Sequence, residues 1–459
     1  MVADDIRPFL SPRSVAVIGA SASPGRVGCI IVENLLSAPH PPHIFAVNPR
    51  GGDVLGLTAY TSLENLPGPA ELAIIAVAPG AIPGVIEDCA RHLVKAAIIT
   101  TSGFAEGGEQ GRRLQEGMVA TAHRGGLRLM GPNTQGTINL DAGLPLLSIP
   151  FSPRFSRPGP ISFAAQSALF PWEFFLNHPH VGISKMIDLG NMCDVDHADC
   201  VDYLVEDDST RVIVLHIEGV SRGGRLMEAC RRATRRKPVI ALKAGRTATG
   251  MRAVESHTGS LAGRDEVYET AFHQAGVFRA YDMDDMCDYI LALGCLPPVK
   301  GRRVGILTTT GAGGTMAADA CHHFGLEVPS LAPSTIKCIR EALPGLVSIH
   351  NPVDVWQMLD MPRLLPGYVA ALNALSDDPG VDALMLVTHA FPDSPFDTTD
   401  ILRDYCAAGV PKPTSVWAIG CPERLQDLSK LSAQGLPYFP TIARAVRALE
   451  VSCAYQRRG

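Results

Sequence analysis

The sequence predicts an α/β protein built on parallel sheets, and three observations carry this prediction. Short runs of apolar residues alternate with longer stretches of helical pattern. The chain's 44 Gly and 36 Pro residues separate many of these segments. Most of the short runs are apolar almost throughout, as expected for strands that helices cover on both faces. We therefore expect doubly wound α/β domains, and 459 residues are enough for two or three of them.

The first third of the chain contains four of these strand-like runs, with helical patterns between them. The helical patterns cover residues 28–37 and 81–92. The strand-like runs cover residues 14–20, 43–49, 71–79 and 95–103. This alternation predicts a Rossmann-like domain of about 130 residues.

The α/β pattern then restarts twice. From Gly159 onward, strand-like runs cover residues 159–170, 182–190, 211–220 and 237–245. The segment 144–160 before and at this restart is rich in Pro and Ser, which predicts a linker or an ordered strap. A second boundary lies near Pro298 to Arg302, and further strand-like runs cover residues 303–314, 382–391 and 412–420. We therefore expect three domains, at residues 1–145, 146–298 and 299–459.

The composition gives no reason to expect a nucleic acid or a membrane as a partner. The 40 basic and 46 acidic residues give a net charge of −6. No apolar run reaches the roughly 18 residues of a membrane span, and the acidic start lacks the basic region of a signal peptide. The 12 Cys residues form no C-x-x-C pair, so we expect neither a disulfide framework nor a metal site. The expected location is the cytoplasm.

A glycine-rich turn follows the first strand-like run. Gly19, Gly25 and Gly28 are placed so that backbone N–H groups and a helix N-terminus face a phosphate, although the spacing is not G-x-G-x-x-G. The second run ends at Asn48 and Arg50, where a NAD site has an acidic residue. A cation there favours a ligand with an additional phosphate, such as coenzyme A or NADP. The alternatives are a plain tight turn and a solvated arginine.

Three further polar turns belong to the same predicted sheet edge. They cover residues 78–80, 103–106 and 130–140. Turns after parallel strands line the crevice at the carboxyl edge, where open α/β sheets bind their ligands. Asn133 in the third turn alternatively caps backbone groups only.

The segment 243–263 contains the strongest candidate for chemistry. His257 lies among small residues that let a large anion approach its imidazole, and neutral histidine is a nucleophile toward phosphorus. Glu218 ends an upstream strand-like run, where a carboxylate can orient or activate an imidazole. Each residue also has an ordinary interpretation, His257 as a structural or exposed histidine and Glu218 as a capping or ion-paired carboxylate.

Ten segments taken together resemble the α subunit of the NDP-forming acyl-CoA synthetases, the superfamily of succinyl-CoA synthetase and the ADP-forming acetyl-CoA synthetases. They occur in the family's order and span nearly the whole chain. The segments are VAVIGAS-ASPGRVG, AVNPR, GFAEGG, GPNTQG, AQSAL, DLGNMCDVD, LHIEGV, LKAGRT, SHTGSLAG and TTTGAGG. The resemblance implies a CoA-binding Rossmann-like domain followed by two flavodoxin-like domains.

The resemblance also implies roles for individual residues. His257 matches the family's phosphorylated histidine, and Glu218 matches the carboxylate that accompanies it. Two helix N-termini that cradle the phosphohistidine match Gln166, Ser167 and Ala168 in one case and Gly311, Ala312, Gly313 and Gly314 in the other. The positions that match the CoA site are Gly19, Ser21, Gly25, Val27, Asn48, Arg50 and Pro79.

The implied reaction converts an acid, CoA and ATP into acyl-CoA, ADP and phosphate through an acyl phosphate and a phosphohistidine. The sequence contains no ATP-grasp segment, so we expect ATP or ADP with Mg²⁺ on a separate ATP-grasp β-type subunit, in a hetero-oligomer. The sequence identifies neither the acid nor the choice between ATP and GTP.

Two positions depart from the family pattern. Ala168 stands where the family has glycine, and a Cβ there would crowd a backbone that must approach phosphate. Thr134 stands where the family has cysteine. These departures leave a second hypothesis open, a CoA-binding regulatory protein without catalysis. A third, an NADP-dependent oxidoreductase, gives the segment 256–263 no role.

Overall fold

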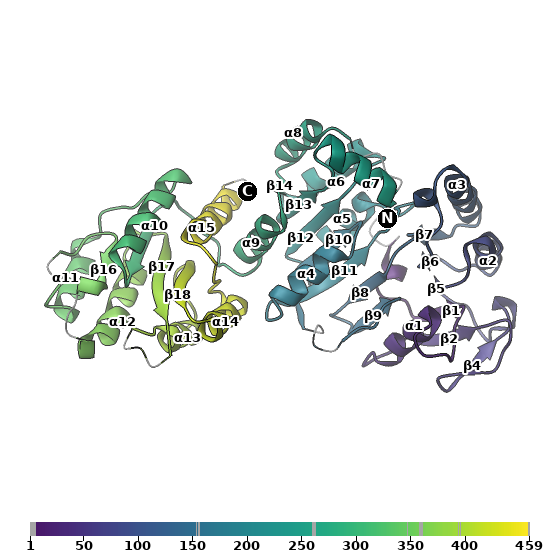
Figure 1. Ribbon diagram of the computed structural model, residues 1–459, viewed down its shortest axis with the longest axis horizontal. Helices are drawn as coiled ribbons and strands as arrows, with labels where there is room; N and C mark the ends of the chain where they lie inside the picture. The colour runs from purple at the N-terminus through teal and green to yellow at the C-terminus, as the bar shows by residue number, and fades with distance from the viewer. Residues whose placement is uncertain are drawn as a thin grey trace. The chain divides into compact units, whose positions relative to one another are not determined.

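The computed structural model describes residues 6–152, 154, 157–258, 263–346, 348–357, 361–392, 394 and 396–457 (Figure 1). The side chains of residues 255–258, 357 and 361–363 lie outside this description. The chain divides into two compact units, Met1–Met286 and Cys287–Gly459, and each is described by itself.

The first sheet of unit 1 has the strand order of a Rossmann fold. Among the described residues its order is β3 (Asp53–Val54), β4 (Leu57–Tyr60), β2 (His43–Val47), β1 (Ser14–Ile18), β5 (Leu72–Ile75), β6 (Ala96–Ile99) and β7 (Arg128–Met130). All neighbours pair in parallel except β3 with β4. If the short β3 is left aside, this is the order 3-2-1-4-5-6, which reverses direction between β1 and β5. The Rossmann-like fold predicted for the first third of the chain is confirmed.

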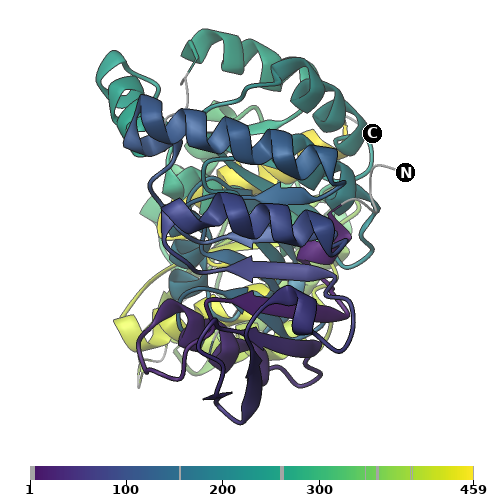
Figure 2. The same ribbon diagram turned by 90° about the vertical axis from the view of Figure 1, so that its right-hand side faces the viewer.

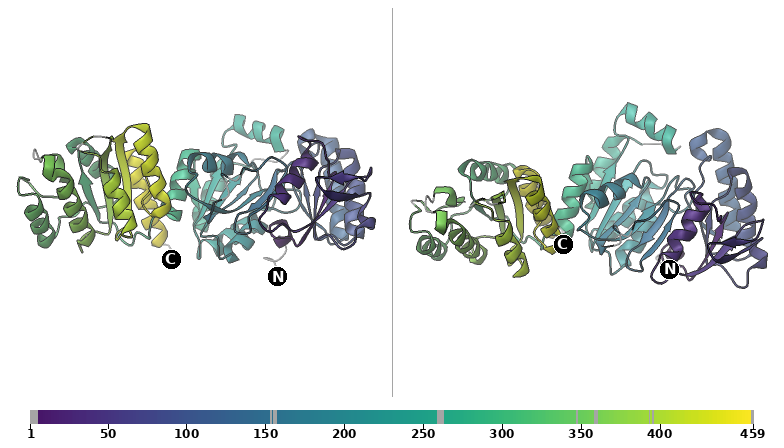
Figure 3. Two further views of the ribbon diagram at one scale, coloured as in Figure 1. Left: turned by 90° about the horizontal axis from the view of Figure 1, so that it is seen from below. Right: turned by 60° about the horizontal axis from the view of Figure 1, so that its bottom comes forward.

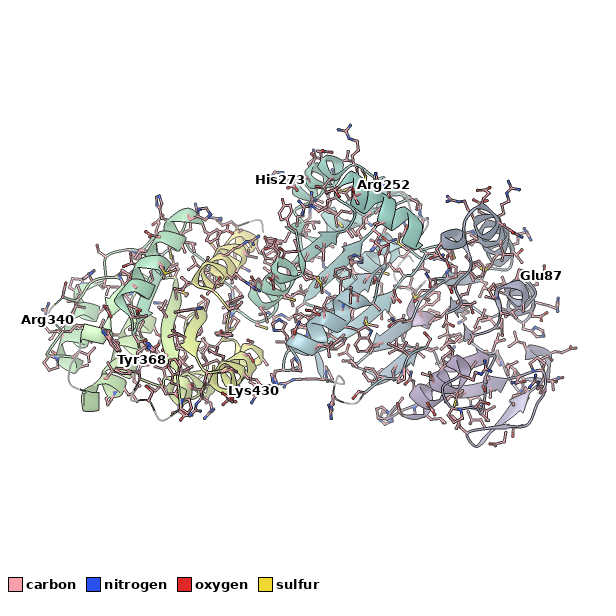
Figure 4. The ribbon with its side chains drawn as sticks, in the orientation of Figure 1. Glu87, Arg252, His273, Arg340, Tyr368 and Lys430 are labelled. Atoms are coloured by element: carbon pink, nitrogen blue, oxygen red, sulfur yellow. The ribbon has the colours of Figure 1, made fainter. Side chains whose placement is uncertain are left out.

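Helices cover both faces of the first sheet, because successive side chains of its strands point to opposite sides. Val15 and Val17 belong to the core that contains α1 (Val27–Leu36). Ala16 and Ile18 belong to the core that contains α2 (Ile82–Arg91) and α3 (Glu109–Arg124). Helices α2 and α3 lie side by side (Figure 2), and Glu87 on α2 points to solvent (Figure 4).

The second sheet of unit 1 has a flavodoxin-like order. Its described strands are β14 (Phe278–Ala280), β13 (Val239–Lys243), β12 (Val212–Ile217), β10 (Pro158–Ala165), β11 (Ile183–Asp188), β8 (Gly136–Asn139) and β9 (Leu144–Leu147). The five strands from β10 to β14 are parallel in the order 2-1-3-4-5, so the direction reverses between β10 and β12. The helices of this region are α4 (Leu169–Asn177), α5 (His197–Glu206), α6 (Gly223–Ala233), α7 (Ala248–Thr258) and α8 (Asp265–Ala275).

The second sheet includes residues that the sequence suggested were turn and linker. β8 lies within the segment 130–140 and β9 within the segment 144–160, and the two strands form an antiparallel hairpin. β8 pairs antiparallel with β11, so the second sheet begins ten residues before the expected boundary at residue 146. Pro and polar residues hid this hairpin, because Pro145 stands within β9 and the hairpin carries no alternation long enough to predict a strand.

Ion pairs and backbone contacts join the two sheets of unit 1. Arg128 of β7 lies 2.9 Å from Asp194 and 3.2 Å from Asp199. The backbone N–H groups of Asn191, Cys193 and Val195 donate to the carbonyls of Pro132, Gly131 and Leu129. The loop after β11 therefore runs beside β7 and continues past its end.

Unit 2 contains a smaller parallel sheet. Its described strands have the order β16 (Val353–Asp354), β15 (Val304–Thr308), β17 (Ala383–Ala390) and β18 (Thr414–Gly420). α10 (Gly311–His323) packs against α15 (Ile442–Gln456), and α11 (Pro333–Ala342) packs against α12 (Met361–Asp377) on the other face of the sheet (Figure 3). Tyr368 of α12 is wholly buried there (Figure 4).

The described residues contain three further α-helices and six 3-10 helices. They are α9 (Met283–Gly294), α13 (Thr399–Ala407) and α14 (Pro422–Lys430), with the 3-10 helices η1 (Arg7–Phe9), η2 (Leu63–Asn65), η3 (Pro79–Ala81), η4 (Ala105–Gly107), η6 (Val355–Gln357) and η7 (Leu431–Gln434). Within the described part of the chain, no helix is both long and apolar enough to cross a membrane. The same part contains no cluster of His, Cys, Asp and Glu that fits a metal ion.

The buried histidine of α5 makes unit 1 sensitive to acid. The Nε2 atom of His197 lies 2.9 Å from the carbonyl oxygen of His216, and burial lowers the pKa of His197 from 6.5 to about 4. The unfolded chain therefore binds a proton at a higher pH than the folded chain, and stability falls as the pH drops from 6.5 toward 4. We expect His197 alone to contribute a loss of about 2 kcal/mol in the free energy of unfolding between pH 7 and pH 5.

Urea denaturation of the parent chain and of His197→Gln at both pH values checks this prediction. The free energy of unfolding of His197→Gln should depend less on pH than that of the parent, because glutamine does not titrate. An equal pH dependence in the two proteins would contradict the prediction.

Candidate functional site

The β1–α1 turn needs glycine for close packing. Gly19 has φ +93°, and a Cβ there would lie 2.4 Å from the carbonyl oxygen of Ala76. A Cβ on Gly28 would lie 2.0 Å from the carbonyl oxygen of Gly19. α1 begins at Val27, and Arg26 before it provides no side-chain cap. The first N–H groups of α1 are therefore available to an anionic ligand.

The other predicted CoA residues lie at the same edge of the first sheet. The Nδ2 atom of Asn48 donates to the carbonyl of Ala20 at 2.8 Å, and its Oδ1 accepts from the backbone N–H of Arg50 at 2.9 Å. Asn48 thus holds the turn after β2 against the turn after β1, while Arg50 is exposed. The Oγ of Ser21 accepts a hydrogen bond from the N–H of Ser23 at 3.1 Å. Gly25 has φ +78° with open space around it, and Pro79 begins η3 after β5.

A row of buried polar side chains lines the carboxyl edge of the second sheet. Gln166 follows β10, Asp188 ends β11, Glu218 follows β12 and Lys243 ends β13. Because β13, β12, β10 and β11 are successive neighbours, the four residues follow one another along this edge. Glu218 and Gln166 flank the point where the strand order reverses, which is where α/β sheets bind ligands.

Gln166 links its neighbours and keeps one polar group for a ligand. Its Oε1 accepts from the backbone N–H groups of Glu218 at 2.7 Å and Gly219 at 3.0 Å. Its side-chain amide nitrogen, Nε2, is buried and has no hydrogen-bond partner among the described residues. A buried N–H donor without a partner is costly, so an acceptor oxygen of a ligand at this position would be favoured.

Burial changes the proton affinity of the carboxylate that ends β11. Asp188 is 4% exposed, and burial is the main cause that raises its pKa from 3.8 to about 6. The N–H groups of Gln135 and Gly190 lower this pKa, whereas the negative charge of Glu218 raises it further. Asp188 therefore titrates near neutral pH.

The buried lysine at the end of β13 borders a cavity. Burial lowers the pKa of Lys243 from 10.5 to about 8, against the opposing charges of Asp265 and Glu218. The ammonium lies 4.8 Å from the ring centroid of Tyr268 and donates to the carbonyl of Ala244. The cavity has a volume of about 590 Å³.

Of the predicted catalytic pair, the structure describes one side chain. Glu218 is buried at the sheet edge, as its strand-end position predicts. The backbone of His257 lies in α7. This helix contacts η4, which lies in the turn after β6 of the first sheet. The imidazole of His257 lies outside the described residues.

Ala168 causes no backbone strain where the resemblance implies glycine. It is the N-cap of α4 with φ −67° and ψ −11°, a right-handed conformation that any L-residue adopts. Ser167 precedes it, and its Oγ accepts a long 3.4 Å hydrogen bond from the N–H of Leu169.

We therefore expect Ala168→Gly to change the rate of protein phosphorylation less than about threefold, since glycine gains nothing from φ > 0 here. The rate of incorporation of labelled phosphate measures this, with the parent chain as the control. A gain of tenfold or more would mean that the Cβ does obstruct the ligand.

The second predicted cradle lies in unit 2. Gly311 and Ala312 form the exposed first turn of α10, and Thr310 before them provides no side-chain cap. Gly313 and Gly314 are buried, where a Cβ would lie 2.5 Å from Val387 and 2.8 Å from Thr308. The last two glycines therefore serve helix packing, and the first two positions present N–H groups to solvent.

Sequence reasoning missed that Asp188 and Lys243 lie at this sheet edge. Asp188 ends β11 and Lys243 ends β13, and both residues lie in segments quoted for the resemblance. The available signal was their charge within an otherwise apolar run, because a charged residue that ends a buried strand points to the sheet edge.

Two family models match the chain. Residues 13–139 match the CoA binding domain, and residues 158–293 match the succinyl-CoA ligase like flavodoxin domain. The first range covers the strands of the first sheet and also β8, and the second covers the parallel strands β10 to β14.

Curated proteins and solved structures match over nearly the whole chain. The α subunit of acetate–CoA ligase [ADP-forming] I of Pyrococcus furiosus is 34% identical, over 97% of this chain and 96% of that protein. Acetate–CoA ligase [ADP-forming] I of Archaeoglobus fulgidus is 35% identical, but this chain spans only 63% of its length. The dinucleotide forming acetyl-coenzyme A synthetase 1 of Ca. Korarchaeum cryptofilum, solved with phosphate and ADP, has a TM-score of 0.89 at 33% identity, over 99% of this chain and 97% of that one. The chain therefore belongs to the family of ADP-forming acetate–CoA ligases.

Proposed function

We propose that the chain is the α subunit of an ADP-forming acyl-CoA ligase, which joins a carboxylic acid to CoA through an acyl phosphate and a phosphohistidine at His257. The observation that carries this proposal is the buried pair of Glu218 and Gln166 at the strand-order reversal of the second sheet. The unpartnered Nε2 of Gln166 is a donor for a phosphoryl oxygen.

The residues divide the work in the following way. CoA binds at the edge of the first sheet, with its phosphates at the first turn of α1 and its ribose phosphate beside Arg50. In the direction that forms acyl-CoA, a carboxylate oxygen of the acid attacks the phosphorus of the phosphohistidine and the imidazole of His257 leaves. In the reverse direction, the imidazole attacks the phosphorus of the acyl phosphate and the acid leaves. Glu218 orients the imidazole and stabilises its positive charge, while Gln166 and the N-terminus of α4 stabilise the charge on the phosphoryl oxygens.

The nucleotide chemistry belongs to a second component in this proposal. The relative from Pyrococcus furiosus is named as an α subunit, and the single-chain relative from Archaeoglobus fulgidus is longer than this chain. We propose that ATP or ADP with Mg²⁺ binds to an ATP-grasp β-type subunit and that the two chains form a hetero-oligomer. CoA and ATP are cytoplasmic metabolites, so we place the complex in the cytoplasm.

The proposal also assigns the segments of the chain. Residues 1–145 bind CoA, residues 146–298 carry the phosphohistidine, and residues 299–459 supply the second cradle at Gly311 and Ala312. The hairpin β8–β9 belongs structurally to the second of these segments.

The test runs the reaction backwards without a nucleotide. The purified chain and a His257→Ala variant are incubated with labelled phosphate and, in separate reactions, acetyl-CoA, isobutyryl-CoA and phenylacetyl-CoA. We expect an acid-labile, base-stable label on the parent chain and none on the variant, and the acyl-CoA that labels fastest identifies the class of acid.

Two results would overturn the proposal. Equal label on the parent and on His257→Ala would exclude His257 as the carrier. No label with any acyl-CoA, by a chain that still binds CoA and has been supplied with an ATP-grasp partner, would support a regulatory CoA-binding protein instead.

A further inference from the structure

We propose that Asp188 is the general base for the CoA thiol in the proposed reaction, a role that nothing above assigns to it and that rests on the proposed function. The proposal depends on where the carboxylate lies, on which of its oxygens is free to accept a proton, and on what the thiol needs in order to react.

The position of Asp188 joins the two halves of the site. It ends β11, and the loop that follows runs beside β7 of the first sheet through the hydrogen bonds to Gly131 and Pro132. The hydroxyl of Thr134, just after β7, donates to the backbone carbonyl of Asp188 at 2.5 Å. Asp188 thus lies where the carboxyl edges of the two sheets meet.

From the proposed phosphate position, the CoA arm can reach this place. With the phosphates at the turn after β1, the arm passes the ends of β5 and β6 before it reaches β7. Three strand spacings amount to about 14 Å, a distance that an extended pantetheine arm covers. The thiol would then arrive beside Gly131 and Thr134, next to Asp188.

One oxygen of the carboxylate is available for a proton. Oδ2 accepts a short hydrogen bond of 2.7 Å from the N–H of Gln135. Oδ1 accepts a long hydrogen bond of 3.4 Å from the N–H of Gly190, and the side chain of Thr134 also lowers the pKa of this carboxyl group. No cation compensates Asp188 directly among the described residues, and the charged group that acts on it is Glu218, which Lys243 balances in turn. A proton on Oδ1 relieves the repulsion between the two carboxylates.

The proton transfer balances without a further reactant. The S–H bond of CoA breaks, and its proton goes to Oδ1 of Asp188. The sulfur forms a bond to the acyl carbon, the bond from that carbon to the phosphate oxygen breaks, and the departing phosphate takes the proton from Asp188. In the reverse direction, phosphate gives its proton to Asp188 as its oxygen attacks the acyl carbon, and Asp188 passes this proton to the departing thiolate. A carboxyl group with a pKa near 6 suits both directions at neutral pH.

Labelling of His257 from two sources, acyl-CoA with phosphate or acyl phosphate alone, distinguishes a role of Asp188 as general base from a structural role. Label from acyl-CoA and phosphate reaches His257 only after the C–S bond breaks, whereas label from the corresponding acyl phosphate involves no thiol. The acyl group used is the one that labels the parent chain fastest. The variant Asp188→Asn keeps the size of the side chain and an oxygen acceptor. Asp141→Asn is the control, because Asp141 pairs with Lys185 near the opposite end of β11.

We expect Asp188→Asn to lose at least 100-fold in labelling from acyl-CoA, the usual contribution of a general acid or base, and less than about threefold in labelling from acyl phosphate. Labelling of the parent from acyl-CoA should fall as the pH drops below about 6, since the reverse direction starts from the ionised carboxylate that takes the proton of phosphate, and the variant should lack this fall. Asp141→Asn should behave as the parent does.

The other outcomes overturn the inference. Equal losses with both donors would mean that Asp188 only supports the fold or the phosphoryl site, and no loss with either would mean that it has no role. If Asp188→Asn fails to fold, Asp188→Ser serves in its place with the same criteria. Absence of label on the parent chain from both donors would instead reject the proposed function itself.

Discussion

A Glu218→Gln variant is expected to lose about 100-fold or more in the rate of His257 phosphorylation, within the range of a lost acid–base or orienting partner. Glutamine has the size of glutamate but no charge, so it cannot stabilise the imidazolium character that develops when the imidazole attacks phosphorus. Glu218 is 5% exposed, and at a buried position an electrostatic effect is larger than in water. Its backbone stays fixed, because Gln166 accepts from the N–H groups of residues 218 and 219.

The measurement is the initial rate of label incorporation from acyl phosphate, which isolates the step at His257. Glu228→Gln is the matched control, because Glu228 is exposed on α6 and forms a surface ion pair with Arg232 at 3.0 Å. The control should keep the parent rate. A Glu218→Gln variant that is labelled as fast as the control would remove Glu218 from the mechanism.

A Gly28→Ala variant is expected to bind CoA at least tenfold more weakly and to unfold at a lower urea concentration than the parent. The new Cβ would lie 2.0 Å from the carbonyl oxygen of Gly19, which is backbone and cannot rotate away. Either α1 moves off the sheet or the turn after β1 changes shape, and overpacking of this kind costs about 1–3 kcal/mol. Both responses displace the N–H groups that face the CoA phosphates.

Calorimetric titration with CoA and urea denaturation measure the two effects. Gly80→Ala is the control at the same sheet edge, because a Cβ at Gly80 meets no atom within 4 Å. CoA affinity equal to that of the control would show that the α1 N-terminus does not hold the ligand.

The elements that could be predicted from the sequence are those with a local signal. The runs that became β1, β2, β5 and β6, and later β10 to β13, are mostly apolar, and turn residues follow each of them. Glu218 could be placed at a sheet edge for the same reason, since it directly follows such a run. A local pattern therefore predicted that Glu218 lies at a strand end.

The neighbours of these residues could not be predicted, because they depend on strand order. The charge of Glu218 raises the pKa of Asp188 because β11 and β12 both pair with β10, which brings the two carboxylates to one sheet edge. A sequence does not state which strands pair. The hairpin β8–β9 was missed for a different reason. It is short and antiparallel and contains Pro145, so its local pattern resembles that of a linker.

The contacts of this hairpin also determine where related chains can be recombined. The side chain of Asn34 in α1 donates to the carbonyls of Leu147 and Ile149. Thr137 and Asn139 of β8 donate to the carbonyls of Phe9 and Leu10, near the start of the described chain. A chimera that joins the CoA-binding half of one protein to the second sheet of another at residue 135 would take the donor and the acceptor of each of these four hydrogen bonds from different parents. Crossover points for exchanging acyl specificity are therefore better placed after β9, where the hairpin is inherited together with α1 and the segment around Phe9.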